Sequence, residues 1–433
     1  MSHSEICGAV RSAPAARGKT QTLSICFVMM LGCSLCAAVA QTPSMEQLVQ
    51  GIARSGSGLS FRGTLVTMIS TPRTTAQTTT RRIIRSANAG VLIINQQPPG
   101  AFSVDDGRTK RSYDPRTRTI TRTNSLFYSL KVMSAQRKAR LIMQNYIIHM
   151  EGRDAIAGRS CYRLSLIPRD PLSRPVKIWV DAATGLPLCH QESDRQGNTL
   201  DLTLFTSIDF PRSIPEHEVR RIFPRKAHEA VMCKSPIFRE ISSLKKVARF
   251  PVYQPNITPA GYLFDQCELV QLGGAPTSIL RYTDGISLIT ICQSRAKSVR
   301  PSCYRLLQSA IHPMGDNMVA YDCGAMDYRV LGHRDKESLI ALARSMDTEG
   351  ERKGLNLLSK TFHVPAKVLT RLRAGGDGLD TITALLMITR HSRKSLAYLE
   401  SLSHDGWGWR SLAKRFHLRE AQIELIIAEI IRS

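Results

Sequence analysis

The sequence predicts an α+β protein with a large antiparallel sheet, a smaller α+β region and an all-helical C-terminal region. Between residues 59 and 209, short stretches rich in Thr, Val and Ile alternate with turns at Gly, Pro, Asn and Asp, which is typical of antiparallel strands. A second α+β pattern follows, and from residue 350 onward the strand pattern gives way to short helical patterns. The 433 residues suffice for two to four domains.

The first folded region begins with a helix. Met45, Leu48, Val49 and Ile52 recur at helical spacing, and Ser44 stands at the N-cap position with a glutamine three residues later, so residues 44–54 are expected to be helical. Strands are expected at 59–70, 78–86, 89–96, 101–104 and 117–123, followed by a second helix over 134–150.

Four further strands with short connections are expected between residues 161 and 209. Tight turns at 181–185 and 194–198 place glycine where a left-handed residue is needed. In the last strand the period of two places Leu202, Leu204 and Ile208 on one face. That apolar face must be covered, and the two predicted helices are available to cover it.

Three segments follow the sheet. Residues 211–240 contain a proline-rich linker with few apolar residues. In residues 241–347 strands are expected near 262–271, 278–283, 286–293 and 317–331, with a helix at 336–346. In residues 348–433, the sequence at 358–364 recurs at 412–418, which predicts a bundle containing two related helix pairs. A cytoplasmic DNA-binding helix-turn-helix is the weaker alternative, because the chain is expected to be exported.

An export signal is expected at the N-terminus. Basic residues precede sixteen uncharged residues, 23–38, which is short for a membrane span, and Ala38-Val39-Ala40 resembles a signal-peptidase site. Residues 1–40 are therefore interpreted as a secretory signal cleaved after Ala40, which places the protein in the periplasm. An uncleaved anchor or lipidation at Cys33 are alternatives that also place the chain outside the cytoplasm.

Seven cysteines remain after cleavage, and an oxidising compartment would allow some of them to pair. The last four, within 57 residues, could form two disulfides in any of three pairings, and the odd total leaves at least one thiol over. No CxxC or HExxH motif follows residue 40, so a metal site is not expected. The seven are Cys161, Cys189, Cys233, Cys267, Cys292, Cys303 and Cys323.

The net charge of +24 is concentrated near the start of the mature chain. Residues 41–150 hold 16 Lys and Arg against 4 Asp and Glu, a net +12. This excess suits an acidic protein, an anionic lipid headgroup or a membrane surface, although a merely solvated basic face explains it equally well. Arg81, Arg82 and Arg85 are the candidate contacts to such an anionic partner.

No motif for catalysis or for a cofactor occurs. The sequence lacks a G-x-S-x-G elbow, a P-loop, a G-x-G-x-x-G and an EF-hand loop, and its eleven histidines are scattered. No catalytic residue, metal or cofactor is therefore predicted, and the protein is expected not to be an enzyme.

Several short motifs resemble known envelope proteins. The run from Ile178 to Leu188, followed by 194–198, is similar to the hairpin shared by LolA-like lipoprotein carriers and the MucB/RseB family of periplasmic regulators, and Gly152 to Tyr162 resembles that family's entry into the preceding strand. Further motifs at 250–262 and 281–288 resemble the MucB/RseB C-terminal domain, which LolA-type carriers lack. The resemblance covers roughly residues 44–347.

The resemblance implies an incomplete antiparallel barrel, closed by helices, that can hold acyl chains, followed by a smaller α+β domain. It sets the expected boundaries at 41–210 for the LolA-like N-terminal domain, 211–240 for the linker, 241–347 for the C-terminal domain and 348–433 for a helical extension without a family counterpart. The expected cavity-lining residues, for which plain core is the simpler alternative, are Leu65, Leu164, Leu166, Trp179, Leu202, Leu204 and Ile208.

Two functions follow from this resemblance. The first is a periplasmic regulator that binds an anti-sigma factor or similar envelope protein, shields it from proteolysis and senses lipid or lipopolysaccharide. The second is a LolA-like carrier of lipid or lipoprotein. The second domain favours the regulator, since a carrier needs none. A nucleic acid is not an expected partner of an exported protein.

Overall fold

The computed structural model describes residues 43–54, 56–71, 74–125, 133–233, 236–299, 317–323 and 325–432. The chain divides into two units, Met1–Thr42 and Pro43–Ser433, and the second is described here. The predicted signal segment, its cleavage site and Cys303 lie outside the described residues.

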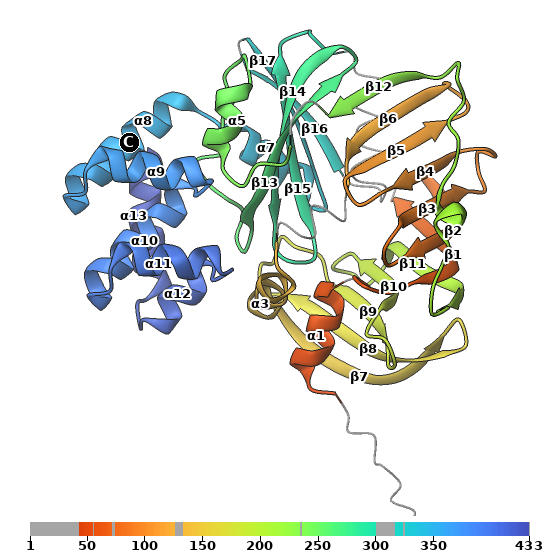
Figure 1. Ribbon diagram of the computed structural model, residues 1–433. Coiled ribbons are helices and arrows are strands. Elements are labelled where there is room, and N and C mark those ends of the chain that lie inside the picture. The colour runs from red at the N-terminus through yellow and green to blue at the C-terminus, as the bar shows by residue number, and fades with distance from the viewer. Residues whose placement is uncertain are drawn as a thin grey trace, which may run out of the picture. The chain divides into compact units, whose positions relative to one another are not determined.

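One continuous sheet of seventeen strands runs through the described part of the chain (Figure 1). Neighbouring strands follow the order β7-β8-β9-β10-β11-β1-β2-β3-β4-β5-β6-β12-β13-β14-β15-β17-β16. Each of these pairs is antiparallel except β6 with β12. The strands are β1 (Phe61–Thr71), β2 (Thr74–Ser86), β3 (Gly90–Asn95), β4 (Phe102–Asp105), β5 (Thr109–Asp114), β6 (Thr119–Asn124), β7 (Tyr146–Ile156), β8 (Arg159–Pro168), β9 (Val176–Asp181), β10 (Pro187–Ser193), β11 (Thr199–Asp209), β12 (His228–Cys233), β13 (Leu263–Leu272), β14 (Ala275–Thr283), β15 (Leu288–Arg295), β16 (Asn317–Cys323) and β17 (Met326–Gly332).

The helices fall into two groups, those that flank the sheet and those of the C-terminal region. The first group is α1 (Met45–Arg54), α3 (Ala135–Asn145), α4 (Glu216–Val219), α5 (Ile241–Val247) and α7 (Lys336–Arg344). The second is α8 (Thr348–Phe362), α9 (Ala366–Gly375), α10 (Leu379–Ser392), α11 (Leu396–His404), α12 (Trp409–Arg415) and α13 (Glu420–Arg432). A mostly antiparallel sheet with a helical C-terminal region is therefore confirmed.

The predicted start of α1 is confirmed as a capping box. The Ser44 hydroxyl accepts a hydrogen bond from the Gln47 backbone N–H at 3.2 Å, and the Gln47 side-chain oxygen accepts one from the Ser44 N–H at 2.8 Å. Two otherwise unpaired donors at the helix start are satisfied in this way.

The helix predicted over 134–150 is wrong in its second half, because α3 ends at Asn145 and β7 begins at Tyr146. Tyr146 adopts extended backbone angles, φ −126° and ψ 146°, and its hydroxyl donates to Asp284 at 2.8 Å. From there the chain pairs with β8 along the whole length of β7. Strand pairing and the buried tyrosine thus override a helical pattern. Strands β5, β7 and β12 were not predicted.

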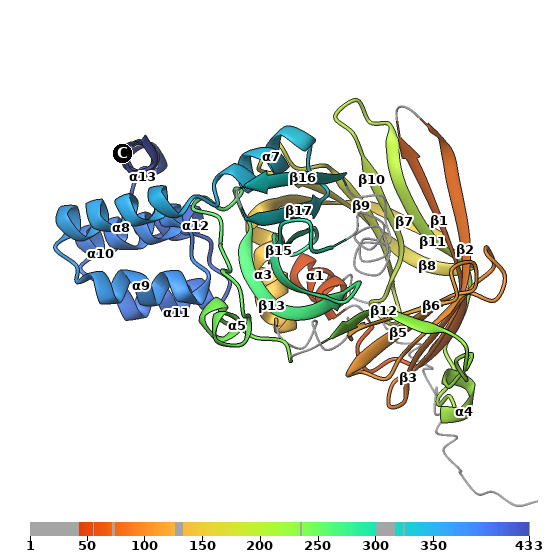
Figure 2. The same cartoon turned by 90° about the horizontal axis from the view of Figure 1, so that it is seen from above.

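Helices α1 and α3 cover the sheet at β8 and β9, and both views show them against these strands (Figures 1 and 2). Their apolar sides pack on alternate residues of the two strands. This core contains Leu48, Val49, Ile52, Ala139, Ile142, Leu164, Leu166, Val176 and Ile178. The two predicted helices do cover an apolar sheet face, but the residues beneath them are those of β8 and β9, and Leu202 and Leu204 are not among them.

The segment expected to begin the linker packs on the sheet. Ile214 and Val219 are 5% and 1% exposed and share a small core with Ile84, Leu92 and Phe102. Residues 214–223 therefore cover the face of β2–β4 opposite the one that faces α1 and α3.

The second region has a core of its own. Strands β13–β17 pack against α5 and α7 through a cluster that includes Leu244, Leu269, Ile291, Val330 and Leu339. The predicted strands and the helix of this region are confirmed, as is the turn at Asp284-Gly285 between β14 and β15.

The C-terminal region contains three helix pairs, α8–α9, α10–α11 and α12–α13. Each pair turns at a residue with positive φ: His363 at 54°, Arg393 at 57° and His417 at 56°. A fully buried residue lies five residues before each turn, and another lies six residues after it. Before the turns these residues are Leu358, Ile388 and Leu412, and after the turns they are Leu369, Leu399 and Ile423. The sequence repeat revealed two of these pairs, and α10–α11 shares their geometry without their sequence.

Four of the cysteines are free thiols: Cys161, Cys189, Cys267 and Cys292. Cys267 is opposite Leu280, which is opposite Ile291, so the neighbouring Cys292 points to the other face of the sheet. The two disulfides that the last four cysteines could have formed are therefore not both present, since Cys267 and Cys292 are free.

Candidate functional site

The inner face of the N-terminal sheet is the face of β8 and β9 that packs against α1 and α3. Residues directly opposite each other on paired strands share a face, so the register extends this face from strand to strand. Leu164 is opposite Ile178, which is opposite His190, then Thr203, then Thr67. The inner face thus continues across β10, β11 and β1 into β2–β5.

The predicted cavity residues lie on both faces of the sheet. Leu65, Leu164, Leu166 and Ile208 are on the inner face. The remaining three are on the outer face, where Trp179, Cys189 and Leu204 are neighbours across β9, β10 and β11, with Leu202 two residues along.

A β-bulge causes the error at Leu202 and Leu204. The register of β1 with β11 shifts between Thr64 and Leu65, so Phe205 and Ile208, three residues apart, point to the same side. The sequence rule of strict alternation therefore assigned Leu202 and Leu204 to the wrong face. Trp179 and its neighbour Ile178 point to different faces of the sheet. The Trp179 indole N–H donates a hydrogen bond to Asp154 at 3.0 Å.

The apolar part of the inner face is occupied by the protein's own helices. Leu164 and Leu166 are completely buried beneath α1 and α3. Leu65 is half-buried beside Phe61 and Phe205, whose rings meet edge to face at 5.8 Å. In this structure Leu164 and Leu166 are therefore core residues.

The predicted cations are also divided between the faces. Arg81 is opposite Leu65 and Arg85 is opposite Phe61, so both lie on the inner face, whereas Arg82 is exposed on the outer face. The Arg85 guanidinium lies 6.0 Å from the centre of the Phe61 ring. An anionic ligand on the inner face could contact Arg81 and Arg85 but not Arg82.

Lys110 is a third inner-face cation that the sequence did not reveal. It is opposite Asp105, which is opposite Val91 and through it Arg85. Burial lowers the pKa of Lys110 and of Arg81, against the attraction of Asp105 and Asp201 respectively. The only available signal was the position of β5 between turns at 105–107 and 114–115, because its residues carry no apolar alternation.

Toward β10 the inner face becomes polar and contacts the second region. Burial lowers the pKa of His190 to about 4, so this imidazole is neutral at pH 7. Two residues along, the nearly buried Glu192 contacts Arg174 at 2.7 Å and Nδ1 of His333 at 2.5 Å. Arg334, beside His333, binds Asp170 at 2.7 Å. These contacts attach the second region to the β8–β9 loop and to β10.

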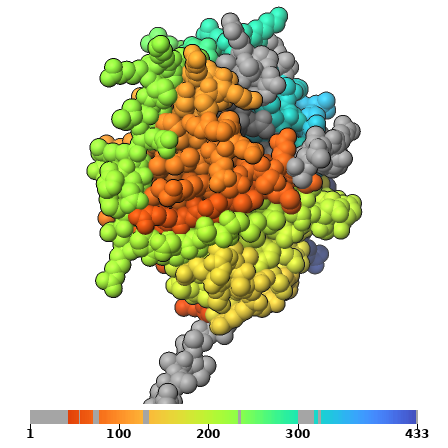
Figure 3. Space-filling view, turned by 90° about the vertical axis from the view of Figure 1, so that its right-hand side faces the viewer, coloured from red at the N-terminus to blue at the C-terminus, as the bar shows by residue number. Residues whose placement is uncertain are grey.

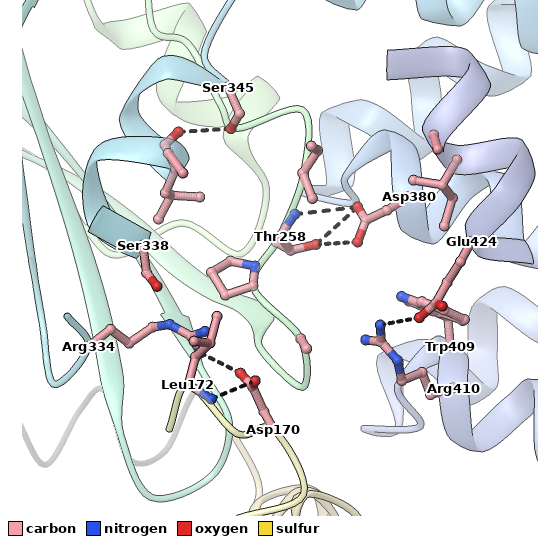
Figure 4. A pocket seen from close by; sticks show the side chains of 17 residues that line it. Asp170, Leu172, Thr258, Arg334, Ser338, Ser345, Asp380, Trp409, Arg410 and Glu424 are labelled. Atoms are coloured by element: carbon pink, nitrogen blue, oxygen red, sulfur yellow. Dashed lines mark hydrogen bonds and ion pairs between the residues drawn. The ribbon is translucent and has the colours of Figure 1, made fainter. Parts of the chain in front are cut away.

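A separate cavity of about 410 Å³ lies next to the Arg334–Asp170 pair (Figure 4). Residues from the β8–β9 loop, the second region and the C-terminal helices line it together. Figure 4 shows Arg334 pointing toward Asp170, Asp380 bonded to Thr258, and Arg410 paired with Glu424 at 2.8 Å. Its polar groups already bind one another, so it is a weaker candidate than the inner face.

Among the described residues, no three His, Cys, Asp or Glu side chains are grouped so as to hold a metal ion. Within the same ranges, no helix has both the length and the apolar character needed to cross a bilayer. The inner face carries positive charge, through Arg81, Arg85 and Lys110.

The chain was compared with solved structures, curated proteins and protein-family models. Among solved structures, a crystal structure of MucB is 17% identical with a TM-score of 0.46, covering 69% of this chain and 95% of that chain. The Pseudomonas aeruginosa MucA/MucB complex gives 16% identity and a TM-score of 0.46, over 70% and 96%. A LolA superfamily protein from Nitrosomonas europaea is 11% identical with a TM-score of 0.22, and the match covers 42% of this chain and 99% of that chain. A search among curated proteins gives no match.

The family model described as the MucB/RseB N-terminal domain matches residues 44–223. The match begins immediately before α1 and ends at Phe223, so it includes the inner face, both covering helices and the segment that packs on β2–β4. The similarity of this chain to the MucB/RseB N-terminal domain is therefore shown over residues 44–223.

Proposed function

We propose that this protein is an exported, non-enzymatic regulator that binds an anti-sigma factor or a similar envelope protein. The observation that carries the proposal is the match of residues 44–223 to the MucB/RseB N-terminal domain. Export through a signal cleaved after Ala40, and a periplasmic location, are parts of the same proposal.

The inner-face cations support a binding role for this domain. Arg81, Arg85 and Lys110 lie on one face of adjoining strands, and burial lowers the pKa of all three. A desolvated cation gains more from an anionic partner than a fully hydrated one does. The proposed ligand is therefore an acidic segment of the partner protein, seated on these three side chains.

The second region supports a regulator over a carrier. His333 and Arg334 attach it to Glu192 and Asp170 of the N-terminal domain through contacts of 2.5 and 2.7 Å. Helices α1 and α3 cover Leu164 and Leu166, so an acyl chain would reach these two residues only after the helices moved. Sensing of lipid or lipopolysaccharide thus requires a rearrangement in this proposal.

Solved structures of MucB include a complex with MucA(peri). The test ligands are accordingly synthetic peptides covering the exported segments of the anti-sigma factors encoded by the source organism. Binding is measured by fluorescence anisotropy with the intact chain from Gln41 onward. We expect a saturable complex for one of these segments, weakened at least about ten-fold by Arg81→Gln/Arg85→Gln, because two charge-assisted contacts are lost.

The matched control is Arg82→Gln, which removes one neighbouring charge from the outer face and should change the Kd less than about two-fold. Equal losses in the inner-face and outer-face variants would contradict an inner-face site.

Native mass spectrometry of the purified protein separates the alternatives. Lipid or acylated peptide as the sole ligand would favour the carrier, and a bound envelope-protein fragment at fixed stoichiometry the regulator.

A further inference from the structure

A hydrophobic side chain projects from the surface after α4. Ile222 is 92% exposed, which is the highest value for a large apolar side chain among the described residues. It lies in the sequence Arg220-Arg221-Ile222-Phe223-Pro224-Arg225-Lys226, which holds four basic residues and no acidic one. An isoleucine usually gains about 1.5–3 kcal/mol by full burial, so its exposure here needs a cause.

The cause is that the chain is anchored on both sides of Ile222. Val219 is 1% exposed in the core with Ile84 and Leu92. The Phe223 ring lies 4.8 Å from the Phe102 ring, with the Arg111 guanidinium 4.1 Å from its centre. With both neighbours held against the sheet, the Ile222 side chain is directed outward.

The four basic residues that flank Ile222 in the sequence are all exposed. Arg225 and Lys226 are exposed, and the side chain of Arg220 is 73% exposed although it pairs with Glu216. Arg221 is exposed as well, with its guanidinium 5.1 Å from the centre of the Phe102 ring. None of the four is buried in the protein.

The adjoining β5–β6 turn adds further positive charge. The His228 N–H donates to the Arg118 carbonyl at 3.1 Å, which places the end of this loop beside the turn. Arg116 and Arg118 are both exposed there. In Figure 3 the green segment that contains the loop lies along the orange strands of the N-terminal domain, and both face the viewer.

We propose that this surface, Arg220–Lys226 with Arg116 and Arg118, docks on an anionic lipid bilayer, with Ile222 entering the interfacial region. A single protruding aliphatic side chain with exposed cations on both sides of it in the sequence suits a lipid headgroup layer, in which each Lys or Arg near the surface adds attraction and the apolar side chain reaches the acyl boundary. An acidic protein partner would need a wider apolar contact than one side chain provides. This inference does not rest on the proposed regulator function.

The test is vesicle flotation with the chain from Gln41 onward, which contains every described element. The apolar residues 23–38 must be absent, because they would bind vesicles by themselves. Vesicles of phosphatidylethanolamine with 30% phosphatidylglycerol are compared with phosphatidylcholine vesicles, at 50 and 500 mM NaCl. We expect binding to the anionic vesicles at low salt only, since the Debye length is shortened at high salt.

Two variants separate the apolar contribution from the charged one. Ile222→Ser should weaken binding to the anionic vesicles about ten-fold by removing the inserted side chain. Arg225→Gln/Lys226→Gln should weaken it about twenty-five-fold, at about five-fold for each charge. Both sites are exposed, so neither variant should alter the thermal unfolding midpoint.

The matched controls change similar side chains elsewhere. Leu425→Ser alters an aliphatic side chain that is 73% exposed on α13, and Lys353→Gln/Lys367→Gln removes two exposed charges from α8 and α9. Both control variants should bind the anionic vesicles with an affinity within two-fold of that of the unmodified protein. The proposal is overturned if the protein does not float with anionic vesicles, if phosphatidylcholine is bound equally, or if the control variants lose as much binding as the loop variants.

Discussion

Two regions of this protein bury positive charge in different ways. Where α9 meets residues 254–256, Arg373 is 3% exposed and all five of its N–H groups donate hydrogen bonds. On the inner face of the N-terminal sheet, burial lowers the pKa of Arg81 and Lys110, and the attraction of Asp201 and Asp105 does not offset it. One region satisfies its cation completely, whereas the other keeps its cations at an electrostatic cost.

The difference lies in how the burial of each charge is balanced. The acceptors of Arg373 are backbone and side-chain oxygens of the same chain, including Gln254, Pro255 and Asn256. Such a group joins the C-terminal helices to the second region and leaves no donor for a ligand. On the inner face, burial lowers the pKa of Arg81 and Lys110 by more than the attraction of the nearby carboxylates raises it.

The largest effect is expected from removing the satisfied cation. Arg373→Ala should lower the free energy of unfolding by about 3–5 kcal/mol, because its buried oxygen partners lose their donors. Arg371, two residues earlier on α9, pairs with Glu400 at 2.8 Å but is 59% exposed. Arg371→Ala should therefore cost less than about 1 kcal/mol. Urea denaturation of both variants measures the contrast, and equal losses would contradict it.

Sequence analysis could predict the elements of the C-terminal region but not this junction. The helices from 348 onward follow from apolar spacing, and the repeat between 358–364 and 412–418 marks two of the three pairs. Arg373 looked like any other basic residue, because three of its partners, Gln254, Pro255 and Asn256, lie more than a hundred residues earlier in the chain. Local patterns contain no information on such contacts.

The next prediction compares the two faces of the N-terminal sheet. Leu166→Ala should lower the free energy of unfolding by about 3–4 kcal/mol, because it leaves a cavity under α1 and α3. Leu204→Ala, on the half-buried outer face, should lower it by about 1–2 kcal/mol. Thermal unfolding followed by circular dichroism measures both values. A larger loss at Leu204 would contradict the assignment of faces.

The face assignment shows where sequence reasoning on the candidate site failed. Alternation placed Leu164 and Leu166 correctly, because β8 pairs with β9 without a bulge. It misplaced Leu202 and Leu204, because one extra residue near Thr64 changes the register of β1 with β11. A bulge leaves no mark in the apolar pattern, and Lys110 escaped notice because β5 is polar on both faces.

The smallest effect concerns pH, and the two regions should respond in opposite directions. His190, on the inner face, has a pKa lowered to about 4 by burial, with Glu192 and His333 nearby. Asp377, beside the Arg373 junction, has a pKa raised to about 7 by burial and by repulsion from Glu400 and Asp380. Their ordinary values are 6.5 and 3.8, so both shifts span nearly the same pH range.

The direction follows from which state of the protein binds the proton. Between pH 4 and 6.5 the unfolded chain protonates His190 and the folded protein does not, so this contribution to stability is lost as pH falls. Over the same range the folded protein holds the Asp377 proton and the unfolded chain does not, so this contribution is lost as pH rises. His190→Gln should therefore reduce the gain in stability from pH 5 to pH 7, and Asp377→Asn should increase it, each by about 1–2 kcal/mol. Urea midpoints at the two pH values measure the change, and a shift of the same sign in both variants would show that the two regions do not differ in this way.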